Sequence, residues 1–119
     1  MKAIGVDMIE TERVAQSIAR FGDRFLRRVY TERELAYCQG RINSLAARWA
    51  AKEAVAKALG TGIGGVNWRD IEVVSQANQR PTIQLHGAAA TLAAQLGLSG
   101  FAISLSHTKD YAVAFVLGE

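Results

Sequence analysis

The stretch Arg48-Trp-Ala-Ala-Lys-Glu-Ala-Val-Ala-Lys-Ala-Leu-Gly60 consists almost entirely of good helix formers and ends in glycine. It predicts the second half of a long helix that runs from Ile42 to Leu59, with Gly60 as its stop. At about 100° of turn per residue, five residues share one side of this helix: Leu45, Ala46, Trp49, Glu53 and Ala56. Glu53 therefore falls in the middle of the side that should face the core. A charge in that position is costly unless it is paired or binds a metal.

The plainer explanation of Glu53 is an ion pair with Lys57, one turn later on the same helix. A second carboxylate makes the metal explanation more attractive. Asp7 interrupts the run from Ala3 to Ile9, which otherwise predicts a strand. Aspartate is depleted in strands, and the alternative is that Asp7 starts a turn or caps the next helix. Thr11 is the better cap, so local structure does not readily explain Asp7.

Composition is that of an ordinary globular protein, with half of the 119 residues hydrophobic and 21% charged. We expect a single domain over residues 1–119. The formal net charge is +3, which permits an anionic partner without requiring one. Cys38 is the single cysteine, and the first residues resemble neither a signal peptide nor a membrane span. We therefore expect a cytoplasmic protein that does not associate with membranes.

The chain after Thr11 shows an apolar stripe with helical spacing, made of Val14, Ile18, Phe21 and Phe25. Gly22 and Asp23 can divide this stretch, so one helix or two are both possible. Four arginines lie beside the stripe: Arg13, Arg20, Arg24 and Arg27. They form either a solvated helix face or a docking surface for an acidic partner.

The remaining patterns predict a capping box at Thr31 to Glu34, strands over Ile71 to Val74 and Thr82 to Leu85, and a helix over Ala88 to Leu96. The two strands are connected through residues 76–80. Apolar strands over Phe101 to Ser106 and Tyr111 to Leu117 form a hairpin. The predicted fold is α+β, with a mostly antiparallel sheet in which the N-terminal strand lies near the C-terminal hairpin, packed against the long central helix.

The glycine-rich segment from Gly60 to Gly65 follows a helix. Phosphate-binding fingerprints place their glycines between a strand and the start of a helix, so this context excludes both the Walker loop and the dinucleotide fingerprint. A connector and a loop that contacts phosphate both stay possible.

Two carboxylates completed by water and phosphate are a usual way for proteins to bind Mg²⁺, whereas one cysteine and two histidines cannot supply a closed zinc site. The cations Arg48, Lys52 and Lys57 project from the same helix as Glu53, with His107 and Lys109 in the last hairpin. Arg48 and Lys52 are four residues apart and should form a basic strip. This pattern indicates a phosphate-bearing substrate.

Three blocks of the sequence carry a family resemblance: Ile4-Gly-Val-Asp-Met-Ile-Glu10, Arg48 through Ile63, and Ile103 through Ala112. In this order and spacing they resemble the holo-[acyl-carrier-protein] synthases, which are 4′-phosphopantetheinyl transferases. The resemblance implies transfer of the phosphopantetheine of coenzyme A to a serine of apo acyl carrier protein, in fatty acid biosynthesis. Adenosine 3′,5′-bisphosphate is the other product.

The resemblance also implies roles for individual residues. The family's Mg²⁺ ligands match Asp7 and Glu53, and its lysine on the same helix matches Lys57. The implied contacts with coenzyme A come from Arg48, Lys52, Gly62, Gly64, Pro81, Ser106, His107 and Thr108, with Pro81 near the adenine. Gln79-Arg80 stands where many relatives carry Gly-Lys. The family's short enzymes are homotrimers with sites between subunits, and the arginines Arg13, Arg20, Arg24 and Arg27 would meet the acidic carrier.

The expected chemistry is in-line phosphoryl transfer with Mg²⁺ and Lys57 offsetting charge on the reacting phosphate. Either Glu53 or a metal-bound water could take the serine proton. One rival function is a small basic nucleic-acid-binding domain, but it leaves Asp7 and Glu53 unexplained and the chain lacks a recognisable binding motif. We therefore expect no nucleic-acid partner. Another rival is a carrier-protein binder without activity.

Overall fold

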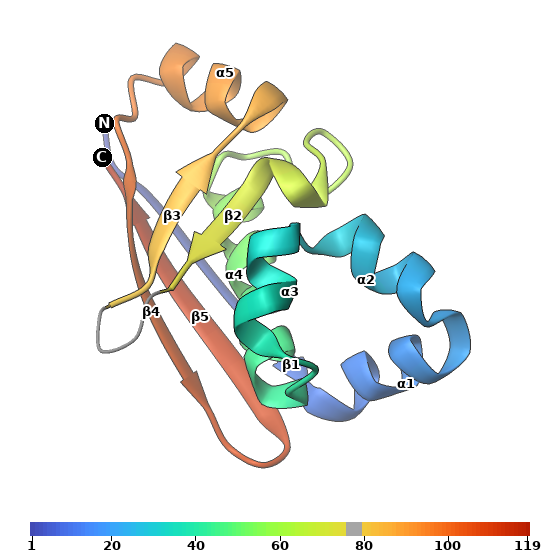
Figure 1. Ribbon diagram of the computed structural model, residues 1–119. Helices are drawn as coiled ribbons and strands as arrows, with labels where there is room; N and C mark the ends of the chain where they lie inside the picture. Colours follow the sequence, from blue (N-terminus) through green and yellow to red (C-terminus); the bar gives the residue numbers. More distant parts are fainter. Residues whose placement is uncertain (76–79) are drawn as a thin grey trace.

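The computed structural model describes residues 1–75 and 80–119 of the protein (Figure 1). The connection predicted through residues 76–80, including the Gln79 position, lies largely outside the described residues. The elements follow in the order β1 (Ala3–Glu10), α1 (Thr11–Phe21), α2 (Asp23–Val29), α3 (Glu32–Cys38), α4 (Ile42–Ala58), a 3₁₀ turn η1 (Trp68–Asp70), β2 (Ile71–Val74), β3 (Thr82–Leu85), α5 (Gly87–Gln95), β4 (Phe101–His107) and β5 (Tyr111–Gly118).

The larger sheet has the strand order β1-β5-β4 and is antiparallel throughout. Asp7 pairs with Ala114 on β5, and Ala114 pairs on its other side with Leu105 on β4. The predicted pairing of the N-terminal strand with the C-terminal hairpin is therefore confirmed. Asp7 lies within a regular strand, so the alternative that it starts a turn is wrong.

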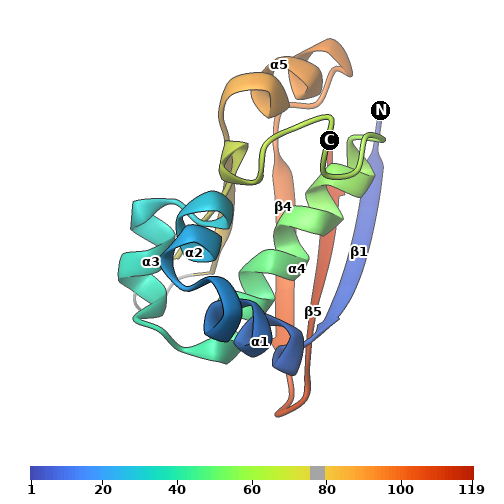
Figure 2. The same cartoon turned by 90° about the vertical axis from the view of Figure 1, so that its right-hand side faces the viewer.

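Helix α4 crosses one face of this sheet and is the centre of the core (Figure 2). The predicted helix is confirmed to within one residue at its end. The prediction of a single apolar side is wrong, because α4 is buried on almost every side by the sheet, α1, α3 and β2. Alanines dominate its buried positions, which allows neighbours to approach it closely all round. The charged residues buried in α4 are Arg48 and Lys52, while Glu53 is only partly buried.

A second, two-stranded sheet pairs β2 with β3 in antiparallel register, at the bounds that the sequence predicts. It packs beside β4 and α4, and α5 follows β3 directly (Figure 1). The backbone N–H of His86 donates to the carbonyl of Asp70 at 2.8 Å, which connects the start of α5 to η1. The mixed α+β fold with antiparallel sheets is therefore as predicted.

The region after β1 forms two helices, because Gly22 adopts a φ of 56° between them. This break turns Phe21 out to solvent, so the predicted four-residue apolar stripe ends at Ile18 in α1 and resumes at Phe25 in α2. Thr11 does not act as the predicted cap. Its hydroxyl donates to the carbonyl of Lys109 at 2.9 Å and connects α1 to the last hairpin.

Helix α3 begins with the capping box that the sequence predicts. The Thr31 hydroxyl accepts from the Glu34 N–H at 3.2 Å, and the Glu34 carboxylate accepts from the Thr31 N–H at 2.9 Å. The helix ends at a turn in which Gln39 and Gly40 both have positive φ. This tight turn folds α4 back beside α3.

The outer face of the larger sheet is apolar and exposed. Ile4, Val6 and Met8 on β1 are 63%, 52% and 65% exposed, and Phe115 on β5 is 49% exposed. An apolar patch of this kind is typical of a surface that contacts another macromolecule. None of the helices in residues 1–75 and 80–119 is both long enough and apolar enough to cross a bilayer.

The contact between β1 and α4 depends on Gly5. A Cβ at this position would lie 1.9 Å from the backbone oxygen of Ala54. Only a residue without a side chain lets the strand and the helix approach this closely.

We predict that Gly5→Ala lowers the stability of the fold by about 3 kcal/mol or more, because the strand and the helix must separate. Gly100→Ala is the matched control, since a Cβ there meets nothing within 4 Å and φ is not positive. The measurement is the denaturation midpoint of each variant at equal protein concentration. Equal midpoints for the two variants would contradict the close contact.

Candidate functional site

Asp7 and Lys57 form an ion pair at the edge where α4 lies over β1. The Lys57 Nζ donates to Asp7 Oδ1 at 2.8 Å and to the carbonyl of Val6 at 3.3 Å. The Asp7 side chain is 17% exposed and that of Lys57 is 52% exposed. The ion pair between Glu53 and Lys57, the plainer explanation of Glu53, is therefore not the one that forms.

Glu53 lies close enough to Asp7 for the two charges to interact. Partial burial raises the pKa of Glu53, and the negative charge of Asp7 raises it further. The Trp49 side chain and the cations Lys57 and Arg13 act in the opposite direction. The two carboxylates that the sequence leaves unexplained therefore converge, from β1 and from α4.

This pair of carboxylates fits a magnesium ion. Among the described residues, no group of three or more His, Cys, Asp or Glu side chains could hold a metal, so Asp7 and Glu53 would be the protein ligands. Mg²⁺ is commonly held by one or two carboxylates, with water and substrate phosphates completing the shell. A cation bound by both carboxylates would also offset the repulsion from Asp7 that raises the pKa of Glu53.

Lys57 keeps its charge at this site. Its hydrogen bond to Asp7 is the largest influence on its pKa and raises it, although slight burial acts the other way. An exposed ammonium that stays protonated beside two carboxylates can contact an anionic substrate that approaches them.

A second cluster lies in a cavity of about 400 Å³ among α3, α4, β4 and the end of the smaller sheet. Arg48, Pro81 and His107, three of the residues predicted to contact coenzyme A, line this one cavity. Arg80 lines it as well, and no carboxylate is among the lining residues in the described part of the chain. The cavity therefore suits an anion.

Arg48 is the most informative residue of this cavity, because it is 96% buried and yet makes no ion pair among the described residues. Its Nη1 donates to the carbonyl of Ser44 at 3.2 Å and its Nη2 to the hydroxyl of Ser75 at 2.6 Å. Its Nε has no hydrogen-bond partner among residues 1–75 and 80–119. A buried cation without a counter-ion is costly, and a bound anion would offset that cost.

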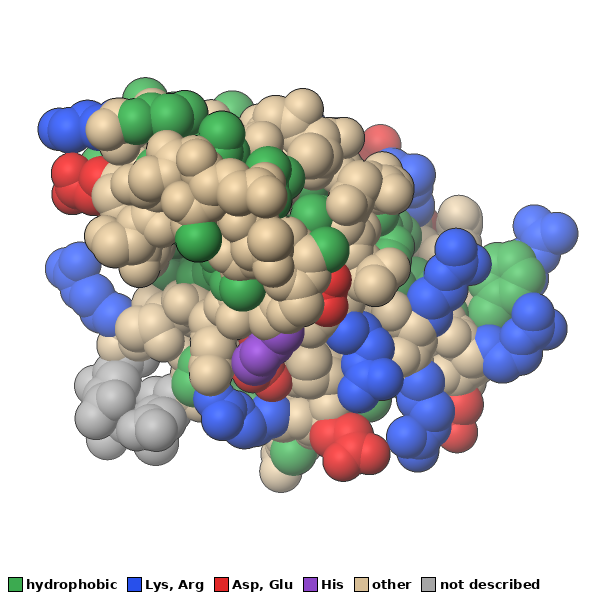
Figure 3. Space-filling view, turned by 90° about the horizontal axis from the view of Figure 1, so that it is seen from above, with side chains coloured by type: hydrophobic (Ala, Val, Ile, Leu, Met, Phe, Trp, Pro, Cys, Tyr) green, Lys and Arg blue, Asp and Glu red, His purple; other side chains and the backbone are tan. Residues whose placement is uncertain are grey.

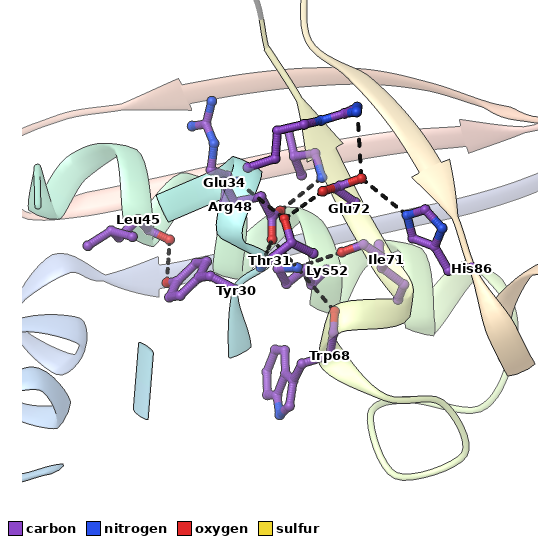
Figure 4. A network of polar contacts seen from close by, with 12 residues as sticks. Tyr30, Thr31, Glu34, Leu45, Arg48, Lys52, Trp68, Ile71, Glu72 and His86 are labelled. Atoms are coloured by element: carbon purple, nitrogen blue, oxygen red, sulfur yellow. Dashed lines mark hydrogen bonds and ion pairs between the residues drawn. The ribbon is translucent and has the colours of Figure 1, made fainter. Parts of the chain in front are cut away.

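Lys52 does not belong to this surface. Its Nζ is fully buried and donates to Glu34 Oε1 at 2.7 Å and to the carbonyls of Trp68 and Ile71 at 3.1 and 2.5 Å (Figure 4). An ammonium has three protons, so all its donors are used. The predicted basic strip of Arg48 and Lys52 is wrong, and the predicted contact between Lys52 and coenzyme A is not compatible with this burial.

The buried ion pair has a structural role. Glu34 also accepts the backbone N–H of Val73 at 2.9 Å in addition to that of Thr31, so its carboxylate joins α3, α4 and β2 (Figure 4). Burial lowers the pKa of Lys52, and the adjacent Glu34 acts against that effect. The ion pair holds the strand that leads to Ser75 against the helix that carries Arg48.

The other predicted substrate contacts occupy loops and strand ends. Gly62 and Gly64 have positive φ in the segment after α4, where the Gly62 N–H donates to the carbonyl of Ala56 at 3.1 Å. Ser106 is exposed at the end of β4, and the Thr108 hydroxyl accepts N–H groups within the hairpin turn. Ser106 and Thr108 are the sequence neighbours of His107, but unlike His107 they are not among the residues that line the cavity.

The carboxylate pair and the cavity lie on different sides of α4. Arg48 and Glu53 are five residues apart, which turns them about 140° from one another around the helix axis. Asp7 belongs to β1 and Leu105, which lines the cavity, to β4, with β5 between these strands. One chain therefore presents two separate groups of candidate functional residues.

Near the carboxylates lies an aromatic cavity of about 300 Å³, lined by Phe21, Phe25, Trp49 and Trp68 with Arg24 and Arg28 at its edge. The Arg13 guanidinium lies 5.6 Å from the centre of the Trp49 ring, four residues before Glu53. Arg13, Arg20, Arg24 and Arg27 are all exposed. Figure 3 shows Lys and Arg side chains gathered over the α1 and α2 side of the molecule.

Sequence reasoning did not find Tyr37, Ser44 and Ser75, which line the Arg48 cavity. The sequence contains a signal for Tyr37 in the pair Gln39-Gly40, where positive φ angles form the turn that folds α4 back against α3 and brings Tyr37 toward Arg48. Ser75 comes to Arg48 through tertiary pairing of β2 with the core, for which the sequence carries no local pattern.

Comparison with known proteins agrees with this geometry. The family model of the 4′-phosphopantetheinyl transferase superfamily matches residues 3–116, and the chain belongs to this superfamily. It is 49% identical to the holo-[acyl-carrier-protein] synthase of Herpetosiphon aurantiacus, covering 99% of this chain and 98% of the relative. It is 53% identical to that of Koribacter versatilis, covering 97% and 95%. The resemblance inferred from the three sequence blocks is therefore confirmed.

The solved structures give the same result. The crystal structure of Helicobacter pylori holo-[acyl-carrier-protein] synthase in complex with coenzyme A superposes with a TM-score of 0.88 at 29% identity, covering 98% of this chain and 99% of that one. By family, the chain is an enzyme of the phosphopantetheinyl transferase type, which favours this function over the nucleic-acid-binding alternative.

The buried ion pair leads to a prediction about stability. Lys52→Met leaves the Glu34 carboxylate without its cation in the core, which should cost about 3 to 5 kcal/mol. Lys57→Met is the control on the same helix, because an exposed ion pair contributes at most about 1 kcal/mol. Urea denaturation of both variants measures the difference. Adding Glu34→Gln to Lys52→Met should recover part of the loss, because it removes the charge and keeps a side-chain oxygen beside the Thr31 and Val73 N–H groups. No recovery would show that the charge is not its cause.

Proposed function

We propose that the chain transfers the 4′-phosphopantetheine group of coenzyme A to a serine of apo acyl carrier protein, as a holo-[acyl-carrier-protein] synthase of fatty acid biosynthesis. Residues 1–119 would form one transferase domain. The observation that carries this proposal is the convergence of Asp7 and Glu53 beside the cation of Lys57, in a chain of this family. Relatives carry the same name, and the similar H. pylori enzyme has been crystallised with coenzyme A.

The proposal includes Mg²⁺, with Asp7 and Glu53 as its protein ligands. When bound, the ion would supply positive charge at the pyrophosphate of coenzyme A. Asp7 is fixed by its place in β1 and by its hydrogen bond from Lys57. Glu53 is fixed by α4, so neither ligand depends on a loop for its position. Rigid elements of this kind suit a site that must hold a phosphate in line.

The proposed reaction breaks the bond between the β-phosphorus of coenzyme A and its bridging oxygen, and forms one between that phosphorus and the serine oxygen. Adenosine 3′,5′-bisphosphate leaves, and the nucleophile belongs to the carrier. The Lys57 ammonium would lie against the phosphate oxygens and offset the charge that they gain. The serine proton would pass to Glu53 or to a metal-bound water, the two acceptors that the sequence leaves open.

Substrate contacts are proposed at the second cluster. Arg48, Pro81 and His107 share the cavity that contains the buried guanidinium, and we assign the nucleotide part of coenzyme A to it. Gly62, Gly64, Ser106 and Thr108 remain proposed contacts through the neighbouring loop and hairpin. Lys52 is removed from this set because its three protons are used in the core.

The carrier protein is assigned to the surface of α1 and α2. Arg13, Arg20, Arg24 and Arg27 are exposed there, and the aromatic cavity between Phe21 and Trp68 opens beside them. An acidic helix with apolar side chains complements a basic rim around an aromatic hollow. The surface reaches the carboxylates through Arg13, Trp49 and Glu53, so a docked carrier could present its serine to the site.

A homotrimer with shared sites is the assembly that we propose. The apolar outer face of β1 and β5 needs cover, and the carboxylates lie apart from the Arg48 cavity within one chain. Head-to-tail packing that closes a ring would bring the carboxylates of one subunit next to the cavity of another. We also propose a cytoplasmic setting, to which the one cysteine, buried and unpaired, is suited.

The activity test is the mass of apo acyl carrier protein after incubation with the chain, coenzyme A and Mg²⁺. The wild-type chain should add one phosphopantetheine group. Glu53→Gln should lower the rate by at least about 100-fold, because it removes a charged metal ligand. Glu32→Gln is the control, since Glu32 is an exposed carboxylate of α3. Full transfer by Glu53→Gln would contradict the metal assignment, and no transfer by wild type would contradict the function.

The shared site leads to a complementation test. Asp7→Asn impairs the carboxylate half and Arg48→Gln impairs the cavity half, so each variant alone should be nearly inactive. Co-expressed in equal amounts, they should regain about one quarter of wild-type activity. In a randomly assembled ring, about one interface in four pairs the intact carboxylates of an Arg48→Gln subunit with the intact cavity of an Asp7→Asn subunit. Asp7→Asn co-expressed with Glu53→Gln is the control and should regain nothing. Absence of recovery in the first mixture would contradict a site made by two subunits.

A further inference from the structure

Tyr37 is placed against Arg48 in a way that the proposed reaction does not explain. The Arg48 guanidinium carbon lies 4.4 Å from the centre of the Tyr37 ring. Tyr37 is 39% exposed at the edge of the cavity, whereas Arg48 is 4% exposed within it. A cation within about 6 Å of an aromatic face is attracted to it, and more strongly when both are shielded from water.

The contacts of Arg48 make this ring important. Two of its nitrogens donate to neutral oxygens, the Ser44 carbonyl and the Ser75 hydroxyl, and the third has no partner in the part of the chain that the structure describes. Carboxylates take no part, so neither a salt bridge nor a complete set of hydrogen bonds fixes the guanidinium in the described structure. The Tyr37 ring and the Ser75 hydroxyl are thus the side chains that hold it.

A second guanidinium lies near the same ring. Arg41 is 5.3 Å from the centre of the Tyr37 ring, and it donates to the carbonyls of Tyr37 and Cys38 at the end of α3. Two like charges close to one ring favour the arrival of an anion between or beside them. The position of Tyr37 is fixed independently of any ligand by α3 and by the turn that follows it.

We propose that Tyr37 is a positioning residue for nucleotide binding, whose ring holds the buried Arg48 guanidinium in the orientation in which it meets a phosphate of the substrate. This inference rests on the proposed function for the identity of the nucleotide. It assigns to Tyr37 a role through Arg48, with no direct contact to the ligand. The hydroxyl of Tyr37 has no part in it, and Ser75 supports Arg48 from β2.

The test uses adenosine 3′,5′-bisphosphate, whose binding to the full chain is measured by calorimetry. Tyr37→Leu, which replaces the ring with a smaller aliphatic side chain, should weaken binding about fivefold, while Tyr37→Phe, which keeps the ring, should bind like wild type. In the transfer assay, Tyr37→Leu should raise KM for coenzyme A by a similar factor, with kcat within about twofold of wild type. Ser75→Ala should weaken binding in the same direction, and it offers a second route if Tyr37→Leu folds poorly.

Combining variants identifies how Tyr37 acts. In an Arg48→Gln background, Tyr37→Leu should cause no further loss, because the two residues act as one unit. A further loss of the same size would mean that Tyr37 contacts the nucleotide directly, and it would overturn the proposal. Equal loss in Tyr37→Phe and Tyr37→Leu would overturn it too, since the hydroxyl would then be responsible. Either result leaves the proposed function intact, whereas a wild-type chain that does not bind the bisphosphate would contradict that function.

Discussion

The close approach of β1 to α4 at Gly5 is the constraint on which the rest of the structure depends. The backbone of the strand lies against the carbonyl of Ala54, with no space for a side chain between them. Asp7 follows Gly5 by two residues and so points to the same face of the sheet, while Glu53 directly precedes Ala54. The contact that closes the core thereby also brings the two carboxylates together. Gly5 and Ala54 form the close contact, and the two carboxylates lie within two residues of them in the sequence.

Helix α4 carries residues of both candidate sites because it is buried on almost every side. An amphipathic helix has one polar side, whereas α4 directs Glu53 and Lys57 toward β1 and Arg48 toward β4 and β2. In the assembly that we propose, a substrate that contacts both groups would lie where two chains meet. The exposed apolar face of β1 and β5 is consistent with such a contact, since burial of Ile4, Val6 and Met8 would stabilise it.

Much of the architecture could be predicted from the sequence because its signals are local. The capping box at Thr31, the Gly60 stop and the strand-forming runs of β2 through β5 predicted element bounds within one or two residues. Asp7 and Glu53 were found because a carboxylate in a strand or on an apolar side contradicts its surroundings. Local patterns could not predict tertiary pairing. Glu53 is the carboxylate nearest to Lys57 in the helix, but in the folded chain Lys57 forms its ion pair with Asp7 of β1. The burial of α4 on all sides was missed because alanine fits an exposed surface as well as a core.

Arg48 and Lys52 show most clearly what the fold adds, because the sequence treats them alike. Both are basic, four residues apart and buried. Lys52 meets a carboxylate and two carbonyls of its own chain, which satisfy its three protons, so its charge is used entirely within the core. Arg48 meets a hydroxyl, a carbonyl and an aromatic ring, and its charge is not neutralised by the described residues. The presence or absence of a carboxylate partner, more than burial itself, therefore separates Lys52, whose charge is neutralised within the fold, from Arg48, which we propose meets a phosphate.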